Sequence, residues 1–118
     1  MSNGAMASRR VALNALQRIE KGATLDNVFP AEAADRALAA LPERDRAFAR
    51  RLVTTTLRHR GEIDTVVKRC LDRPLPKTAE RRRNILRLGI AQLLFANIAP
   101  HAAVDNTVRL EGTARLRG

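Results

Sequence analysis

Arginine is the residue type whose positions point to chemistry in this sequence. Arg81, Arg82 and Arg83 stand directly before the most apolar run of the chain, where a helix is expected to begin. The N-terminal end of a helix carries the positive end of its macrodipole, so three cations there reduce helix stability. A planar guanidinium binds a phosphate group through two parallel hydrogen bonds. We therefore interpret this cluster as a contact for a polyanion.

Other arginines follow helical spacing or open an expected helix. Arg44, Arg51 and Arg58 recur every second turn along one flank of a helix, and Arg9 and Arg10 open the first helix. Any one of them could be a solvated residue or the partner of a nearby carboxylate, but the collection favours binding. If the helix starts converge, they form one basic patch suited to RNA. The candidate RNA-binding residues are Arg9, Arg10, Arg44, Arg51, Arg58, Arg81, Arg82 and Arg83.

The overall charge agrees with a polyanionic partner. The 118 residues include 22 basic and 12 acidic ones, a formal net charge of +10, and only three of the basic residues are lysine. Such an excess favours nucleic acid, because phosphate contacts dominate affinity for it. The alternative is an arginine-rich but ordinary solvated surface, as a GC-rich genome would produce.

Residues for catalysis, metal binding or cofactor binding are not expected in this chain. The six glycines are scattered and form no phosphate-binding loop, and His59 and His101 lack a second ligand at metal-site spacing. Cys70, the only cysteine, is expected to be buried on an apolar helix face and fits a reducing, cytoplasmic compartment. No run approaches the about 20 apolar residues that span a bilayer, so no membrane partner is expected.

The aromatic residues indicate how RNA would be bound. Phe29, Phe48 and Phe95 are the only three, and all fall at core positions of the helical pattern. With no aromatic platform for unstacked bases, binding should depend on backbone and shape and should weaken steeply with salt.

The hydrophobic pattern predicts an all-α fold. Residues 1–7 are expected to be a flexible lead or a remnant of cloning, with Met6 as a second candidate start, and residues 8–118 one helical domain. Ser8 and Thr78 are predicted helix caps. The predicted helices span residues 8–21, 31–41, 42–59, 62–71, 79–95 and 101–111, with a short apolar turn at 25–29.

The 79–95 helix is predicted to be the central spine of the core, because apolar residues cover nearly its whole circumference. Within it, Gln92 should be a buried amide with its hydrogen bonds satisfied, and Gly89 should let a neighbouring helix approach closely. A pair between Asp64 and Lys68 is expected one helix back. The last helix should turn Ala103, Val104, Thr107 and Leu110 inward and end at Gly112.

Three segments resemble a known family: RDRAFARRLVTTTLRHRGEID (44–64), RPLPK (73–77) and RNILRLGIAQLLFANIAPHAAVDNTV (83–108). They are similar to the N-terminal NusB-like domain of the Sun/Fmu family, also called RsmB. The similarity covers the chain from Ser8 to about Leu110. Members of that family are S-adenosylmethionine-dependent enzymes that methylate C5 of a cytosine in 16S ribosomal RNA.

The resemblance implies a helical bundle of the antitermination-factor type, acting as an RNA-binding accessory domain with ribosomal RNA as partner. In the family a covalently linked methyltransferase domain follows, whose cysteines perform the chemistry and which binds S-adenosylmethionine. Cys70 is not at that catalytic position, so this chain is expected to be non-catalytic and without a cofactor. The family also continues beyond the helix containing Thr107 into a closing helix; without it, an exposed apolar groove could favour a homodimer.

Two other functions stay open at this point. Free-standing NusB, a transcription antitermination factor, is similar in fold but typically lacks the sequence motif LLF…PHAAV. Alternatively, the helices are a protein-docking module and the arginines serve solubility.

Overall fold

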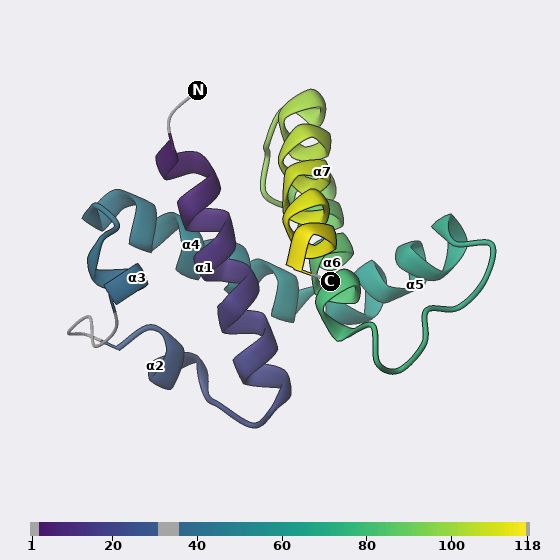
Figure 1. Cartoon of the computed structure of the whole chain (residues 1–118), viewed down its shortest axis with the longest axis horizontal. Coiled ribbons are helices and arrows are strands. Elements are labelled where there is room, and N and C mark those ends of the chain that lie inside the picture. Colours follow the sequence, from purple (N-terminus) through teal and green to yellow (C-terminus); the bar gives the residue numbers. More distant parts are fainter. Residues whose placement is uncertain (1–2, 31–35, 118) are drawn as a thin grey trace. The chain divides into compact units, whose positions relative to one another are not determined.

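The computed structural model describes residues 3–30 and 36–117. These residues form seven helices and no strand (Figure 1), which confirms the predicted all-α class. The helices are α1 (Asn3–Glu20), α2 (Leu25–Val28), α3 (Arg36–Ala39), α4 (Glu43–Arg58), α5 (Arg60–Cys70), α6 (Glu80–Leu94) and α7 (Pro100–Arg117). The chain divides into two compact units, Met1–Val53 and Thr54–Gly118, which we call unit 1 and unit 2.

The first helix of unit 1 starts earlier than predicted. It begins at Asn3, so the described residues 3–7 are helical and not a flexible lead, and Met6 is buried. Ser8 is buried inside the helix, where its hydroxyl donates to the Ala5 carbonyl at 3.0 Å, so its predicted role as a cap is wrong. Alanine and methionine are strong helix formers, which explains the extension. The helix ends at Glu20, one residue before the predicted end at 21, and Gly22 follows with a φ of 108° that suits glycine.

The connection between α1 and α4 contains two short helices. Thr24 caps α2 through a capping box: the Asn27 amide donates to the Thr24 hydroxyl at 3.1 Å, and the Thr24 amide donates to the Asn27 side chain at 3.2 Å. The first part of the predicted 31–41 helix lies outside the described residues, and α3 forms its described part. Leu38 and Leu41 are buried, as their spacing predicts.

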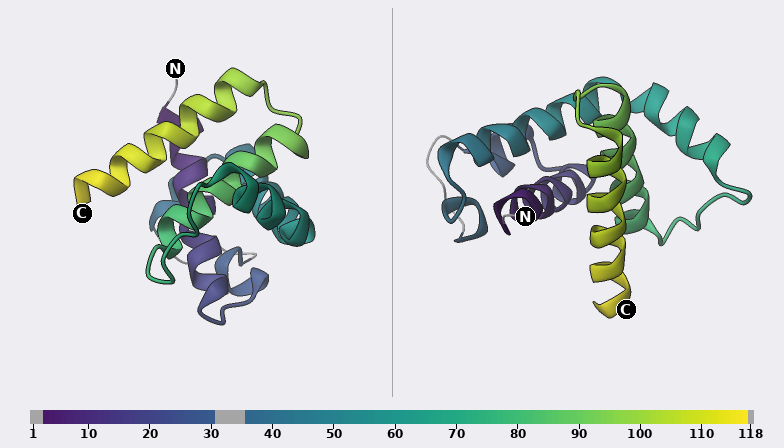
Figure 2. Two further views of the ribbon diagram at one scale, coloured as in Figure 1. Left: turned by 90° about the vertical axis from the view of Figure 1, so that its right-hand side faces the viewer. Right: turned by 90° about the horizontal axis from the view of Figure 1, so that it is seen from above.

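In unit 2, α6 and α7 form an antiparallel hairpin with closely packed helices (Figures 1 and 2). A Cβ atom on Gly89 would lie 2.6 Å from the Thr107 hydroxyl oxygen, which confirms the predicted close approach. Gln92 is fully buried and donates to the Leu88 carbonyl and to the Asn106 side chain, both at 3.1 Å, as predicted for a satisfied amide. These contacts fix the register of the two helices.

The predicted all-round burial of α6 is wrong at its C-terminal end. Leu93 and Leu94 are 40% and 55% exposed, so α6 is buried along most of its length but is not enclosed throughout. Its start follows Ala79, which makes no side-chain capping bond, so the predicted cap at Thr78 is also wrong.

The last helix differs from the prediction in face and length. Val104 is 54% exposed, whereas Asn106 is buried between Ala103 and Leu110. A face built from positions 103, 106 and 110 follows the helical repeat, and position 104 lies about 100° away from 103. Gly112 lies inside α7 and does not end it.

The fourth predicted helix also needs a correction. Cys70 is the last residue of α5 and is exposed rather than buried. None of the helices in the described part of the chain combines the length and apolar character needed to cross a bilayer.

Candidate nucleic-acid interface

The positive charge is distributed unevenly between the two units. Unit 2 contains 13 basic and 6 acidic residues, whereas unit 1 contains 9 and 6. The formal charges are therefore +7 and +3. Unit 2 presents the stronger attraction for a polyanion.

In unit 1, Arg9 is engaged inside the fold. Its side chain is buried, donates to the Ala5 carbonyl at 2.9 Å, and places the guanidinium carbon 5.0 Å from the centre of the Phe48 ring. Burial lowers the pKa of the Arg9 guanidinium below its usual value, because desolvation penalises the charged form. This environment gives Arg9 a role in holding α1 against α4, which sequence spacing alone does not show.

The other predicted arginines of unit 1 are exposed. Arg10 lies on α1, and Arg44 and Arg51 lie on α4. Arg51 approaches the same ring as Arg9, with its guanidinium carbon 5.7 Å from the Phe48 centroid. The structure thus brings Arg9 and Arg51 together around Phe48, a cation–π arrangement that leaves Arg51 accessible.

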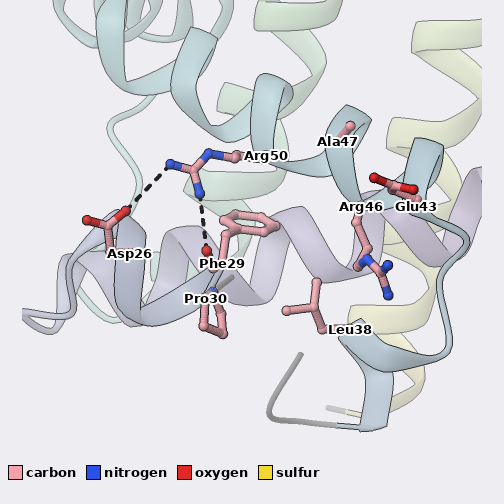
Figure 3. A pocket seen from close by; sticks show the side chains of 8 residues that line it. All are labelled: Asp26, Phe29, Pro30, Leu38, Glu43, Arg46, Ala47 and Arg50. Carbon is pink, nitrogen blue, oxygen red and sulfur yellow. Dashed lines mark hydrogen bonds and ion pairs between the residues drawn. The ribbon is translucent and has the colours of Figure 1, made fainter. Parts of the chain in front are cut away.

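A pocket of about 560 Å³ also lies in unit 1 (Figure 3). Arg50 bridges two of its sides: it donates to the Phe29 carbonyl at 3.1 Å and pairs with the Asp26 carboxylate at 3.5 Å (Figure 3). Pro30, another lining residue, directly precedes residues 31–35, which lie outside the described part. We therefore assign no ligand to this pocket.

In unit 2, two of the three arginines that open α6 have partners on different elements. The Arg82 Nε donates to the Glu111 carboxylate of α7 at 2.7 Å, whereas Arg83 donates to the Pro76 carbonyl of the preceding loop at 2.9 Å. Consecutive helical residues point about 100° apart, which explains the divergence. Arg81 is half-buried, and Arg58 is exposed at the end of α4. That all eight predicted arginines share one surface stays a prediction.

Four further cations of unit 2 were not among the predicted contacts. Lys68, Arg69, Arg73 and Lys77 are all exposed on α5 and on the loop that leads to α6. For Arg73 and Lys77 the signal in the sequence is the segment RPLPK, in which two prolines keep basic residues on an exposed loop.

One arginine of α6 is buried and paired. Arg87 donates from Nε to one Asp64 oxygen at 2.7 Å and from a terminal nitrogen to the other at 3.1 Å, and a further bond reaches Asn84 at 2.9 Å. The predicted pair between Asp64 and Lys68 is therefore wrong, because Asp64 turns toward α6. This two-pronged contact ties α5 to α6.

The Phe48 and Phe95 rings both have neighbouring side chains packed against them. The Phe95 ring stacks on the His59 ring with centroids 3.8 Å apart and planes inclined by 3°, and His59 contacts the Glu62 carboxylate at 3.0 Å. Phe48 carries the two arginines described above. Any RNA contact in these places would therefore involve cations more than ring stacking.

Comparison with known proteins gives the family. The sequence model of the NusB family matches residues 6–115. Over 110 residues the chain is 26% identical to ribosomal RNA small subunit methyltransferase B of Escherichia coli O1:K1 / APEC and 29% identical to the protein of that name from Erwinia tasmaniensis, covering 92% of this chain and 24% of each relative.

A protein of Mycobacterium tuberculosis (strain ATCC 25618 / H37Rv), whose name describes it as a methyltransferase, is 35% identical over 106 residues. That match covers 89% of this chain and 22% of the relative. The chain thus spans about a quarter of the length of these relatives. No solved structure matches it. The family match extends over nearly all of the described helices, and the chain belongs to the NusB family.

Proposed function

We propose that this chain is a non-catalytic RNA-binding module that helps a covalently linked methyltransferase domain to hold small-subunit ribosomal RNA in the cytoplasm. The observation that carries the proposal is the charge of unit 2, with 13 basic against 6 acidic residues. The substrate class comes from the relatives named ribosomal RNA small subunit methyltransferase B. S-adenosylmethionine would bind the linked catalytic domain.

The exposed cations of unit 2 are suited to phosphate contacts. The Arg82–Glu111 ion pair is half exposed on the arginine side, and exposed pairs contribute only about 0–1 kcal/mol. The exposed part of the Arg82 guanidinium can contact a phosphate while its Nε stays paired with Glu111. Arg83 uses one of its five N–H donors on Pro76, and Arg58 is exposed at the end of α4. We assign the main contacts to Arg58, Arg82 and Arg83, with Arg10, Arg44 and Arg51 as candidates in unit 1.

Removing cations from unit 2 tests this assignment. The variant carries Arg58→Gln, Arg82→Gln and Arg83→Gln, and its affinity for a small-subunit ribosomal RNA fragment is measured by fluorescence anisotropy at low salt. We expect binding to weaken by about tenfold or more, because three phosphate contacts are lost.

The matched control removes three exposed cations of unit 1 that are not assigned to RNA. It carries Arg18→Gln, Lys21→Gln and Arg36→Gln and so has the same net charge. We expect it to lose clearly less affinity. Equal losses in both variants would show that binding follows net charge only, and the assignment would then be wrong.

An observation also favours a second function, docking onto a protein. Leu93, Leu94, Val104 and Val108 are exposed by 40% to 63% near the α6–α7 end of unit 2. Exposed apolar side chains that lie together are common in protein interfaces. If the wild-type chain binds no RNA even at low salt, docking onto a protein becomes the favoured function. A free-standing antitermination factor would instead prefer one specific leader RNA.

A further inference from the structure

A second pocket lies within unit 2 and has no assigned role. Its volume is about 490 Å³, and it is an open pocket lined by residues of α5, the loop at residues 71–79 and the first half of α6. Figure 1 shows this loop leaving the end of α5 and returning to the start of α6. Pockets that take small organic ligands have volumes of this size. We call it the α5–α6 pocket.

The inner part of the α5–α6 pocket is aliphatic. Val67 is buried, and Leu71 and Leu75 are half-buried along the lining. Flat aliphatic surfaces can hold a nucleobase that has left its stack, as apolar side chains do in proteins that bind extruded bases. These residues supply an apolar surface that the three phenylalanines do not offer.

One side of the pocket is held rigidly. Asp64 and Arg87 both line it, and they are joined by the two hydrogen bonds of 2.7 Å and 3.1 Å described above. Because the two charges compensate each other, Asp64 and Arg87 shape the wall of the pocket but contribute little net charge to it. A lining fixed by such contacts loses little freedom when a ligand enters.

The mouth of the pocket carries groups that can bind the phosphate of a nucleotide and the amino group of its base. Lys68 is exposed and Arg83 half-buried, so both cations are within reach of a phosphate entering from solvent. Asp72 is exposed and also lines the pocket. Its carboxylate can accept hydrogen bonds from the amino group of cytosine, adenine or guanine, which uracil lacks.

We propose that the α5–α6 pocket takes one unstacked nucleotide of the RNA. The base lies against Val67, Leu71 and Leu75, and its phosphate contacts Lys68 and Arg83. This inference rests on the proposed function, since it assumes that RNA binds to unit 2. It adds a contact to a base where the arginines alone provide contacts to the backbone.

The test compares two short single-stranded RNAs with equal numbers of phosphates. One carries 2-aminopurine at its centre, and the other carries an abasic site there. Because the protein contains no tryptophan or tyrosine, 2-aminopurine fluorescence can be read with little protein background. We expect the base-containing RNA to bind about tenfold more tightly, since an apolar surface is buried only in that complex. Its fluorescence should change on binding.

A double variant with unchanged charge tests whether the preference for the base-containing RNA arises at the α5–α6 pocket. Leu71→Asn with Leu75→Asn leaves the charge unchanged, so we expect the preference for the base to disappear while the salt dependence of binding stays the same. The control carries Leu93→Asn and Leu94→Asn at the far end of α6 and should keep the preference. Circular dichroism checks that both variants are folded.

The possible failures are distinguishable. If wild-type protein binds both RNAs equally well and with the same salt dependence, the pocket proposal is wrong while RNA binding stands. If it binds neither RNA at low salt, the pocket proposal is wrong, and binding of the small-subunit ribosomal RNA fragment decides the proposed function separately. If the double variant keeps the preference, the base is held at another place.

Discussion

Gly89 and Thr107 mark the point where α6 and α7 come closest in unit 2. The space for a Cβ on Gly89 is taken by the Thr107 hydroxyl, which donates to the Ala103 carbonyl at 2.7 Å. Threonine is branched at Cβ, so rotating the side chain would bring its methyl group toward the same place. Relief of the contact therefore requires either a new Thr107 rotamer, which breaks its bond to Ala103, or a shift of one helix.

This contact predicts the effect of adding one methyl group. Gly89→Ala should lower the free energy of unfolding by about 1–3 kcal/mol, because the overpacking outweighs the better helix propensity of alanine. Chemical denaturation followed by circular dichroism measures it.

A second substitution provides the control. Thr107→Ala combined with Gly89→Ala removes the atoms that clash and should recover most of the lost stability. A double variant as unstable as Gly89→Ala alone would contradict the assigned contact.

Single residues also show what the sequence can and cannot predict. Gly89 and Gln92 were predicted correctly, because a small residue and an amide in an apolar helix leave few alternatives. Arg9 and Asp64 were not, because their partners come from distant segments. Which carboxylate or ring an arginine meets depends on helix rotations of a few tens of degrees, and these are not encoded in local spacing.

The pairing of α6 with α7 depends on a reciprocal amide contact. Gln92 donates to the Asn106 oxygen at 3.1 Å, and Asn106 donates to the Gln92 oxygen at 2.8 Å and to the Ala102 carbonyl at 2.8 Å. Both residues are buried. Two polar groups that satisfy each other inside a core fix one register between helices, because any shift leaves both unsatisfied.

A double-mutant cycle tests this pairing. Gln92→Leu and Asn106→Leu should each cost about 1–3 kcal/mol of unfolding free energy, since each leaves a buried amide without its partner. The double variant should cost less than the sum of the two.

The control for this double-mutant cycle is a pair of residues on the exposed face of α7. Val104→Ala and Val108→Ala should each change stability by less than about 0.5 kcal/mol and should be additive. Additive costs for Gln92 and Asn106 would mean that the amides do not act as a pair.

At the level of elements, the middle of each helix was easier to predict than its ends. The pattern around α4 predicted a helix over residues 42–59, and the structure places it at Glu43–Arg58. The predicted cap at Ser8 was wrong because a hydroxyl residue can also sit inside a helix and bond to a backbone carbonyl, as Ser8 does. The predicted cap at Thr78 missed by one residue, because Ala79 is the residue that precedes α6. The predicted buried face of α7 wrongly included Val104, which is exposed. The sequence of this helix lacks a strongly apolar face that would fix which residues point inward.

For the whole molecule, the sequence predicts the class, the family and the excess of positive charge, and all three follow from features that do not depend on tertiary detail. Arg82 and Arg83 meet different partners, Glu111 and the Pro76 carbonyl, because consecutive helical residues diverge, and RNA binding by Arg81–Arg83 stays a prediction. What the fold adds is the concentration of charge in unit 2 and the α5–α6 pocket beside it.

We propose that RNA phosphates bind to the cations of unit 2, and the decisive measurement is the salt dependence of binding. For a small-subunit ribosomal RNA fragment, the logarithm of the association constant should fall linearly with the logarithm of the salt concentration. The three main contacts of unit 2 contribute about −2 to this slope in single-stranded RNA. The Arg58→Gln, Arg82→Gln, Arg83→Gln variant should give a slope shallower by about 2. An identical slope in that variant, or no binding at low salt, would contradict the claim.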